Sequence, residues 1–261
     1  MSSEFWLGVL QTGIGSGLGF MFGIGAFHYQ LHKQSNKEKK EDWRASLDAL
    51  NRLTMSAGAN IEALANSKRQ LIDDLKPEVE TMKRAVSECY DTPLAERKSK
   101  ILSLISTSEA LRHFYMSLPK NSVMPPPDFS EYSSLGKNMP VLTLFVHRAM
   151  GMMVEINDQI DSRNTLIAEH SRENGTGEGM TAEHVVYYTT MLADKGEAIY
   201  EHTDFALDFW RLVIDQVKAY ITAKAKGEHY LAFEFVPMAE KAMPKEELFP
   251  LMRGQLVSFD G

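Results

Sequence analysis

The side chains that could carry acid–base or metal chemistry in this 261-residue chain are spread out rather than grouped. A di-iron site in a helical bundle needs Glu-x-x-His pairs on facing helices. Glu109 precedes His113 by four positions, and Glu and His are adjacent at 169–170 and again at 201–202. None of these spacings meets the requirement, so the sequence predicts no di-iron centre.

Two histidines near the N-terminus have a spacing that zinc accepts on one helix face. His28 and His32 are four apart, but no carboxylate lies between them. Neither the G-x-S-x-G of a hydrolase nor the H-E-x-x-H of a zinc protease occurs in the chain. We therefore predict no catalytic residue, no metal and no cofactor, and a protein that is not an enzyme.

The most polar stretch within a long predicted helix is EINDQIDSRN, at 155–164. Glu155, Asp158 and Asp161 step by three and line roughly one face, whereas Arg163 and Asn164 lie nearer the apolar stripe. One interpretation is a solvated face plus a buried polar pair that fixes the register of the helices. The other is a polar pocket between paired helices.

The N-terminal stretch GVLQTGIGSGLGFMFGIGAF, at 8–27, is uncharged and rich in glycine. A dinucleotide-binding loop requires G-x-G-x-x-G, but Leu18 and Phe22 stand where the third glycine would be. A cleaved export signal needs a basic start and a small-x-small cleavage site, which are not found. The 23 residues from Phe5 to Phe27 would span about 35 Å as a helix, against a hydrocarbon core of about 30 Å. This stretch is therefore predicted to be a transmembrane helix.

The charges on either side of this stretch predict its orientation. One acid, Glu4, precedes it, and five basic residues follow it: Lys33, Lys37, Lys39, Lys40 and Arg44. Because Lys and Arg near a membrane end favour the cytoplasmic side, we expect the N-terminus outside and the C-terminal domain in the cytoplasm, at the plasma (inner) membrane. Membrane lipid is thus the first predicted partner.

Small residues within the stretch recur at the spacing of a helix face. Gly15, Gly19 and Gly23 are four apart, and Gly13 and Gly17 form a neighbouring stripe. Small residues at this spacing let two helices approach closely in a membrane. We predict a helix–helix contact there, and with it a homo-oligomer or a subunit of a membrane complex.

Charge and cysteine content exclude further classes. The net charge is −7, whereas a nucleic-acid-binding surface would be basic, so no nucleic-acid partner is predicted. A single cysteine excludes an intramolecular disulfide and a cysteine-rich zinc site. That residue, Cys89, lies on the apolar side of a predicted helix and is expected in the core.

The first half of the remaining chain is predicted to be helical. Apolar or small residues recur at 4-3-4-3 spacing from Trp43 to Leu64, which indicates a heptad seam. The seam either extends a coiled coil from the membrane helix or packs only within its own domain. Pro77 marks a new helix or a kink. Thr92 is the expected N-cap of a helix that runs to about Ser117.

The second half begins with a proline-rich linker at 118–138, where three consecutive prolines favour polyproline II. This linker is either a stiff connector or a peptide-recognition segment. Two long helices, at 139–171 and 181–224, are then expected to pair as an antiparallel hairpin.

The predicted fold is all-α, with a single N-terminal transmembrane helix followed by a soluble bundle of long antiparallel helices. Its parts are a transmembrane anchor at 1–28, a basic juxtamembrane stalk at 29–42, a helical segment with heptad seam and hairpin at 43–117, the linker at 118–138, the long hairpin at 139–226 and an irregular tail at 227–261. We expect a scaffold or subunit that acts through protein–protein contacts. A membrane-tethered sensor or signal relay is the alternative, and a pore-forming effector ranks below it.

Overall fold

The computed structural model describes residues 3–131, 140–175, 181–224, 230, 237–245 and 248–250, and between residues 3 and 21 it describes the backbone alone. Within these ranges the regular structure is helical and contains no strand, which confirms the prediction of an all-α chain. The chain divides into two compact units, Met1–Ala49 and Leu50–Gly261.

The first unit consists of the N-terminal part of α1 (Ser3–Ser67). Every side chain from residue 22 to residue 44 is exposed, apart from Ser35 and Trp43, which are half-buried. Among the described residues, no helix combines the length and the apolar character that crossing a membrane requires. The transmembrane anchor proposed for 1–28 accordingly stays a prediction.

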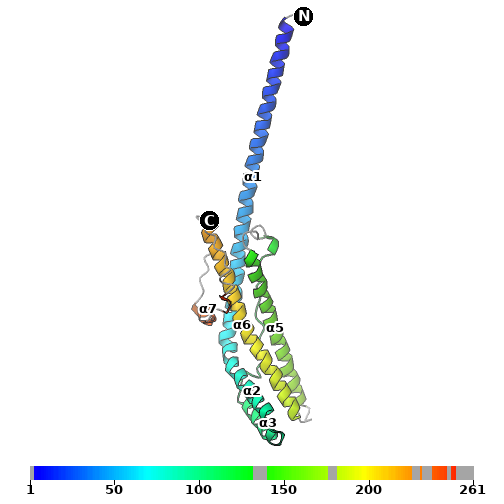
Figure 1. Ribbon diagram of the computed structural model, residues 1–261, viewed down its shortest axis with the longest axis vertical. Helices are drawn as coiled ribbons and strands as arrows, with labels where there is room; N and C mark the ends of the chain where they lie inside the picture. Colours follow the sequence, from blue (N-terminus) through cyan, green and yellow to red (C-terminus); the bar gives the residue numbers. More distant parts are fainter. Residues whose placement is uncertain are drawn as a thin grey trace. The chain divides into compact units, whose positions relative to one another are not determined.

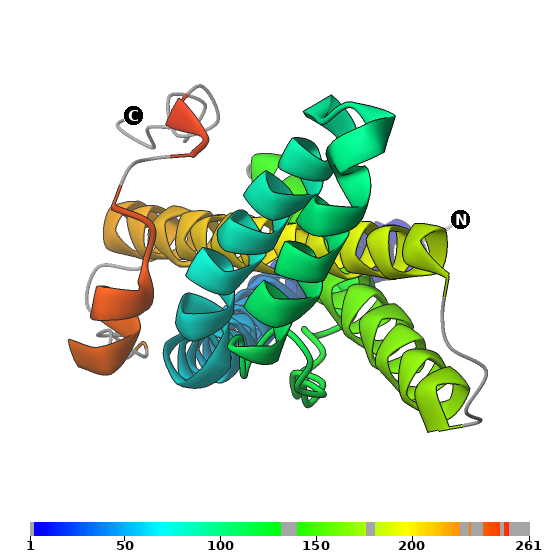
Figure 2. The ribbon, with the colours of Figure 1, turned by 90° about the horizontal axis from the view of Figure 1, so that it is seen from below.

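The second unit is a helical bundle. It contains the rest of α1 and the helices η1 (Lys68–Ile72, a π-helical turn), α2 (Asp73–Asp91), α3 (Leu94–Glu109), α5 (Pro140–Gly175), α6 (Ala182–Lys224) and α7 (Pro237–Ala242). The two longest of its later helices, α5 and α6, lie antiparallel along each other (Figure 1). The shorter pair, α2 and α3, lies side by side across α6 (Figure 2).

The heptad seam is buried inside the second unit from Leu50 onward. Its buried members there are Leu50, Thr54, Ala57, Ile61 and Leu64. The sequence leaves two arrangements of the seam open. This part of the seam has the second arrangement, because it packs within its own domain. Burying these side chains inside the second unit supplies the hydrophobic stabilisation that a lone helix lacks.

The new helix expected at Pro77 is wrong, because Pro77 lies inside α2. The alternative, a kink at Pro77, stays a prediction. The irregularity comes earlier, at the π-helical turn, where the N–H of Asp73 donates to the carbonyl of Lys68. Pro77 is exposed, so its ring faces solvent and the helix gives up one backbone hydrogen bond there. The buried stripe resumes after the turn with Ile72 and Leu75.

Two helices of the second unit approach closely at a glycine. A Cβ added to Gly196 of α6 would lie 2.5 Å from Cγ2 of Val79 on α2. That distance is shorter than side-chain contacts allow, so only glycine fits without movement of the Val79 side chain or of the helices.

The end of α3 differs from its prediction. The helix was expected to reach Ser117 but ends at Glu109, and the hydroxyl of Thr92 donates to the carbonyl of Glu88 instead of capping α3. The start of α6 is as predicted, because Oγ1 of Thr181 accepts from the N–H of His184 at 3.3 Å. Residues 110–128 therefore form a connector that begins earlier than the predicted linker at 118–138.

Described residues of the tail contact the bundle. Nζ of Lys68 donates to the carbonyl of Ala242 at 3.0 Å and also pairs with Asp204. The ring of Phe249 stacks on Phe209, with centroids 4.3 Å apart. Most of the predicted tail lies outside the described residues.

Candidate functional site

Two asparagines of α5 bind the main chain of the connector. Nδ2 of Asn164 donates to the carbonyl of Leu118 at 2.8 Å, and its Oδ1 accepts from the N–H of the same residue at 2.9 Å. Asn157 binds Asn121 in the same two-bond manner, at 3.1 and 2.8 Å. Each amide thus satisfies both polar main-chain groups of one connector residue.

A third asparagine, on α1, repeats the arrangement further along the connector. Asn60 donates to the carbonyl of Met124 at 2.9 Å and accepts from its N–H at 2.7 Å. The hydroxyl of Ser56, one turn earlier, donates to the same carbonyl at 2.8 Å. We call Asn60, Asn157 and Asn164 the asparagine clamp.

The residues that the clamp binds, at 118, 121 and 124, are three apart. Polyproline II has three residues per turn, so the main-chain groups of every third residue face the same side and lie about 9 Å apart. Asn157 and Asn164 are seven residues apart on α5, which places them about 10 Å apart along the helix axis. The two spacings are close, so a connector in this conformation fits the face of α5 that carries Asn157 and Asn164.

An arginine beside the clamp binds the start of the connector. Arg163 is fully buried, and its guanidinium donates to the carbonyls of His113, Phe114 and Met116 at 2.9, 2.5 and 2.6 Å. Burial lowers the pKa of Arg163 to about 10, and the negative charge of Glu78 opposes that shift. The guanidinium therefore stays protonated at neutral pH and keeps its donors for the three carbonyls.

A carboxylate on α2 also binds this end of the connector. Glu78 accepts from the N–H of Phe114 at 2.6 Å and lies 3.0 Å from Nδ1 of His113. Helical hydrogen bonding would use the same main-chain groups of 113–116 that Glu78 and Arg163 bind here. This competition is a physical reason why residues 113–116 do not continue the helix to Ser117.

The chemistry of this cluster is recognition of a main chain. The side-chain amides donate and accept hydrogen bonds and the guanidinium only donates them, and neither group offers a nucleophile or a general base. The clamp binds main-chain groups and does not select a connector residue by its side chain. It excludes proline at 118, 121 and 124, because it needs the backbone N–H there. Prolines instead follow the bound residues directly, at Pro119 and Pro125.

The polar stretch of α5 is therefore divided between two surroundings. Glu155, Asp158 and Asp161 are exposed, which confirms the predicted solvated face, and Asp161 pairs with Lys120 of the connector at 2.5 Å. Arg163 is buried and Asn164 is half-buried, and both bind the connector, not a facing helix, which differs from both interpretations. Sequence reasoning placed Asn157 in the polar stretch without giving it a role, and it missed Asn60. The signal was asparagine at heptad spacing, at 157 and 164, in a chain that also has a proline-rich linker.

The predicted basic juxtamembrane residues, at 33, 37, 39, 40 and 44, are all exposed, and Nζ of Lys37 lies 3.7 Å from Glu41. An added Cβ at Gly23 would have nothing within 4 Å. The other predicted contact residues, Gly13, Gly15, Gly17 and Gly19, lie outside the residues whose surroundings are described. In the described part of the chain, no group of three His, Cys, Asp or Glu side chains is placed to hold a metal ion.

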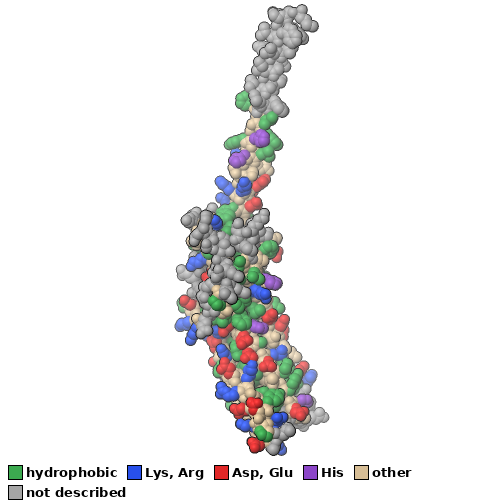
Figure 3. All heavy atoms as spheres, in the orientation of Figure 1, with side chains coloured by type: hydrophobic (Ala, Val, Ile, Leu, Met, Phe, Trp, Pro, Cys, Tyr) green, Lys and Arg blue, Asp and Glu red, His purple; other side chains and the backbone are tan. Residues whose placement is uncertain are grey.

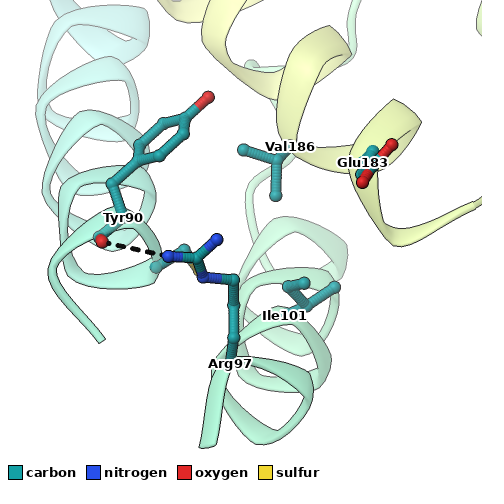
Figure 4. Close-up of a pocket in the computed structure, with 6 residues that line it drawn as sticks. Tyr90, Arg97, Ile101, Glu183 and Val186 are labelled. Atoms are coloured by element: carbon teal, nitrogen blue, oxygen red, sulfur yellow. Dashed lines mark hydrogen bonds between the residues drawn. The ribbon is translucent and has the colours of Figure 1, made fainter. Parts of the chain in front are cut away.

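A cavity of about 130 Å³ opens between α2, α3 and α6. It is lined by Cys89, Tyr90, Arg97, Ile101, Glu183 and Val186. Figure 4 shows the guanidinium of Arg97 between Tyr90, Ile101 and Val186. Cys89 is buried, as predicted, and burial raises the pKa of its thiol. The cavity therefore combines apolar walls, a neutral thiol and one cationic side chain.

Comparison of the chain with protein-family models, with curated proteins and with solved structures gives no match.

Proposed function

We propose that this chain is a membrane-anchored helical protein that acts as a scaffold or subunit through contacts of its bundle with other proteins. The observation that carries the anchor is a row of exposed large apolar side chains on α1. Between residues 22 and 31 these are Phe22, Ile24, Phe27, Tyr29 and Leu31, with exposed fractions of 76, 43, 60, 69 and 46%. Figure 3 shows hydrophobic side chains and histidines along this part of the helix.

Lipid is the occupant that fits these side chains best. A helix that is apolar on all sides is stable only when another surface or a bilayer covers it. The row continues an uncharged sequence that starts at Phe5, and exposed lysines follow it from Lys33 onward. Aromatic residues and histidine next to basic residues are typical of the boundary between lipid and water.

The proposal that the bundle acts through protein contacts is supported by exposed side chains near the cavity. Tyr90, Leu102 and Tyr187 are 60, 60 and 56% exposed. Tyr90 lines the cavity, while the other two directly follow cavity residues in the sequence. Tyrosine is enriched in protein–protein interfaces because it offers a large apolar surface together with one polar group.

The test is membrane association of the full chain in cells. We expect the wild-type protein in the membrane fraction and resistant to alkaline carbonate extraction. Phe22→Glu/Phe27→Glu should shift it towards the soluble fraction, since a charge in the bilayer costs a few kcal/mol. Val154→Glu, which removes an exposed apolar side chain from α5, is the control and should leave the distribution unchanged. Release of the wild type by carbonate would reject the anchor.

A membrane-tethered sensor is the second candidate, favoured by the cavity. Its lining by Arg97 and Cys89 offers a ligand more specific chemistry than an apolar gap would. Co-purification of the full chain from mild detergent separates the two candidates. A stoichiometric protein partner supports the scaffold, and a bound small molecule without such a partner supports the sensor.

A further inference from the structure

We propose that the cavity between α2, α3 and α6 binds a small monocarboxylate whose apolar body is about the size of a benzene ring. The inference comes from one juxtaposition. Arg97, whose buried Nε–H has no hydrogen-bond partner among the described residues, lines a cavity that is otherwise mostly apolar.

The size and walls of the cavity define the body of the ligand. Ile101 and Val186 contribute aliphatic surface, and Cys89 contributes a thiol that behaves as a small apolar group. An apolar protein cavity of about 150 Å³ is known to bind benzene. The volume of about 130 Å³ here is close to that size.

The state of Arg97 defines the polar group of the ligand. Its Nη2 donates to the carbonyls of Tyr90 and Thr92, both at 3.4 Å, at the C-terminal end of α2. These are long hydrogen bonds to neutral acceptors, and no ion pair of Arg97 occurs among the described residues. A buried donor without a partner is costly, and a carboxylate is the acceptor that a guanidinium binds best.

The other titratable groups leave the charge of Arg97 available. Because burial raises the pKa of Cys89, its thiol is neutral at neutral pH and does not pair with the guanidinium. Glu88, the nearby acid on α2, lies 3.1 Å from Nζ of Lys100. Glu183 lines the cavity but is exposed, so water screens its repulsion of an anion.

The single cysteine provides a reporter for this cavity. Full-length protein in mild detergent is treated with a small neutral thiol reagent, and the rate of Cys89 modification is measured with increasing benzoate or benzamide. The two probes have nearly the same shape, but only benzoate is charged. Benzoate should slow the reaction saturably, and benzamide should need a concentration at least about tenfold higher, as expected for loss of a charged hydrogen bond.

Variants assign the preference to one side chain. Arg97→Gln should abolish the preference for benzoate, whereas Lys98→Gln, which removes a positive charge from the exposed residue next to it, should keep that preference. Because Arg97 also contacts the end of α2, the melting temperature of each variant is measured first. Ile101→Phe, which narrows the cavity and keeps Arg97, should reduce protection by both probes.

A second measurement detects binding without labelling, for the case in which the buried thiol reacts too slowly. Saturation-transfer NMR detects bound benzoate directly, and the signal should fall in Arg97→Gln and stay in Lys98→Gln. Equal protection by the two probes, a benzoate preference that survives in Arg97→Gln, or no benzoate binding in either measurement would each overturn the proposal.

Discussion

The guanidinium of Arg163 donates to the carbonyl of Phe114 at 2.5 Å, and both side chains are fully buried. The two residues belong to different elements, α5 and the connector, and they meet in the interior of the second unit. A buried arginine is tolerated there because three main-chain carbonyls surround it and Glu78 supplies a negative charge.

We predict that Arg163→Met destabilises the protein by about 3 kcal/mol, since hydrogen bonds from a charged group are lost and the carbonyls of the connector become unpaired. The free energy of unfolding is measured by denaturant titration in mild detergent. Arg172→Met, at an exposed position of the same helix, is the control and should change it by less than about 0.5 kcal/mol. Equal effects would show that Arg163 contributes no more than a surface arginine.

The clamp predicts where proline is tolerated in the connector. Met124→Pro removes the N–H that donates to Oδ1 of Asn60, so it should lower the free energy of unfolding by about 1–3 kcal/mol. Met124→Ala keeps that N–H and should cost less, and Ser122→Pro, at an exposed position that the clamp does not bind, should be close to neutral. Thermal unfolding of the three variants checks the order. A costly Ser122→Pro would mean that the clamp does not determine the path of the connector.

The close approach of α2 and α6 predicts opposite effects for one substitution at two glycines. Gly196→Ala would bring a methyl group against Val79 and should destabilise by about 1–3 kcal/mol. Gly151→Ala, on α5, has nothing within 4 Å of the added carbon and should stabilise by up to about 1 kcal/mol through helix propensity. Unfolding free energies of both variants decide it, and stabilisation by Gly196→Ala would contradict the observed approach.

Tyr200 predicts a loss of stability at alkaline pH. Burial, with Glu197, Glu201 and Glu80 adding to it, raises the pKa of Tyr200 from 10.0 to about 12. Between these values the folded state binds more protons than the unfolded state, so stability falls as pH rises through this window. Denaturant midpoints at about pH 9 and about pH 11 should therefore differ less in Tyr200→Phe than in wild type. Tyr90→Phe, at an exposed position, is the control; an unchanged difference in Tyr200→Phe would exclude this residue as the cause.

The lysines that follow the uncharged stretch predict the orientation of the anchor. A reporter fused after Gly261 should be active only when it is one that works in the cytoplasm. Changing Lys33, Lys37, Lys39 and Lys40 together to Gln should weaken this bias, as measured by paired cytoplasmic and external reporters. External activity of the wild-type fusion would reverse the predicted orientation.

The features that sequence reasoning predicted correctly depend on neighbouring residues. Thr181 caps α6, and Lys224 ends it, because capping and periodicity act within a few turns. The seam from Leu50 to Leu64 is buried for the same reason. Local pattern alone was enough for the bundle class and for its longest helices.

The features that sequence reasoning missed depend on residues far apart in the chain. The main chain of Phe114, in the stretch that was expected to be helical, is bound by Glu78 and Arg163, which lie 36 and 49 positions away. No local signal in 110–117 announces that distant side chains take its main-chain groups. The role of Asn60 is hidden in the same way, since its partner lies 64 positions away.

The clamp also has a consequence for how this protein can change over generations. Because asparagine binds the main chain at 118, 121 and 124, the side chains in between do not set the path of the connector. Lys120 and Ser122 are exposed at these intervening positions. Mutation is therefore free to alter the charge and shape of this surface while its geometry persists, as long as the bound positions never become proline.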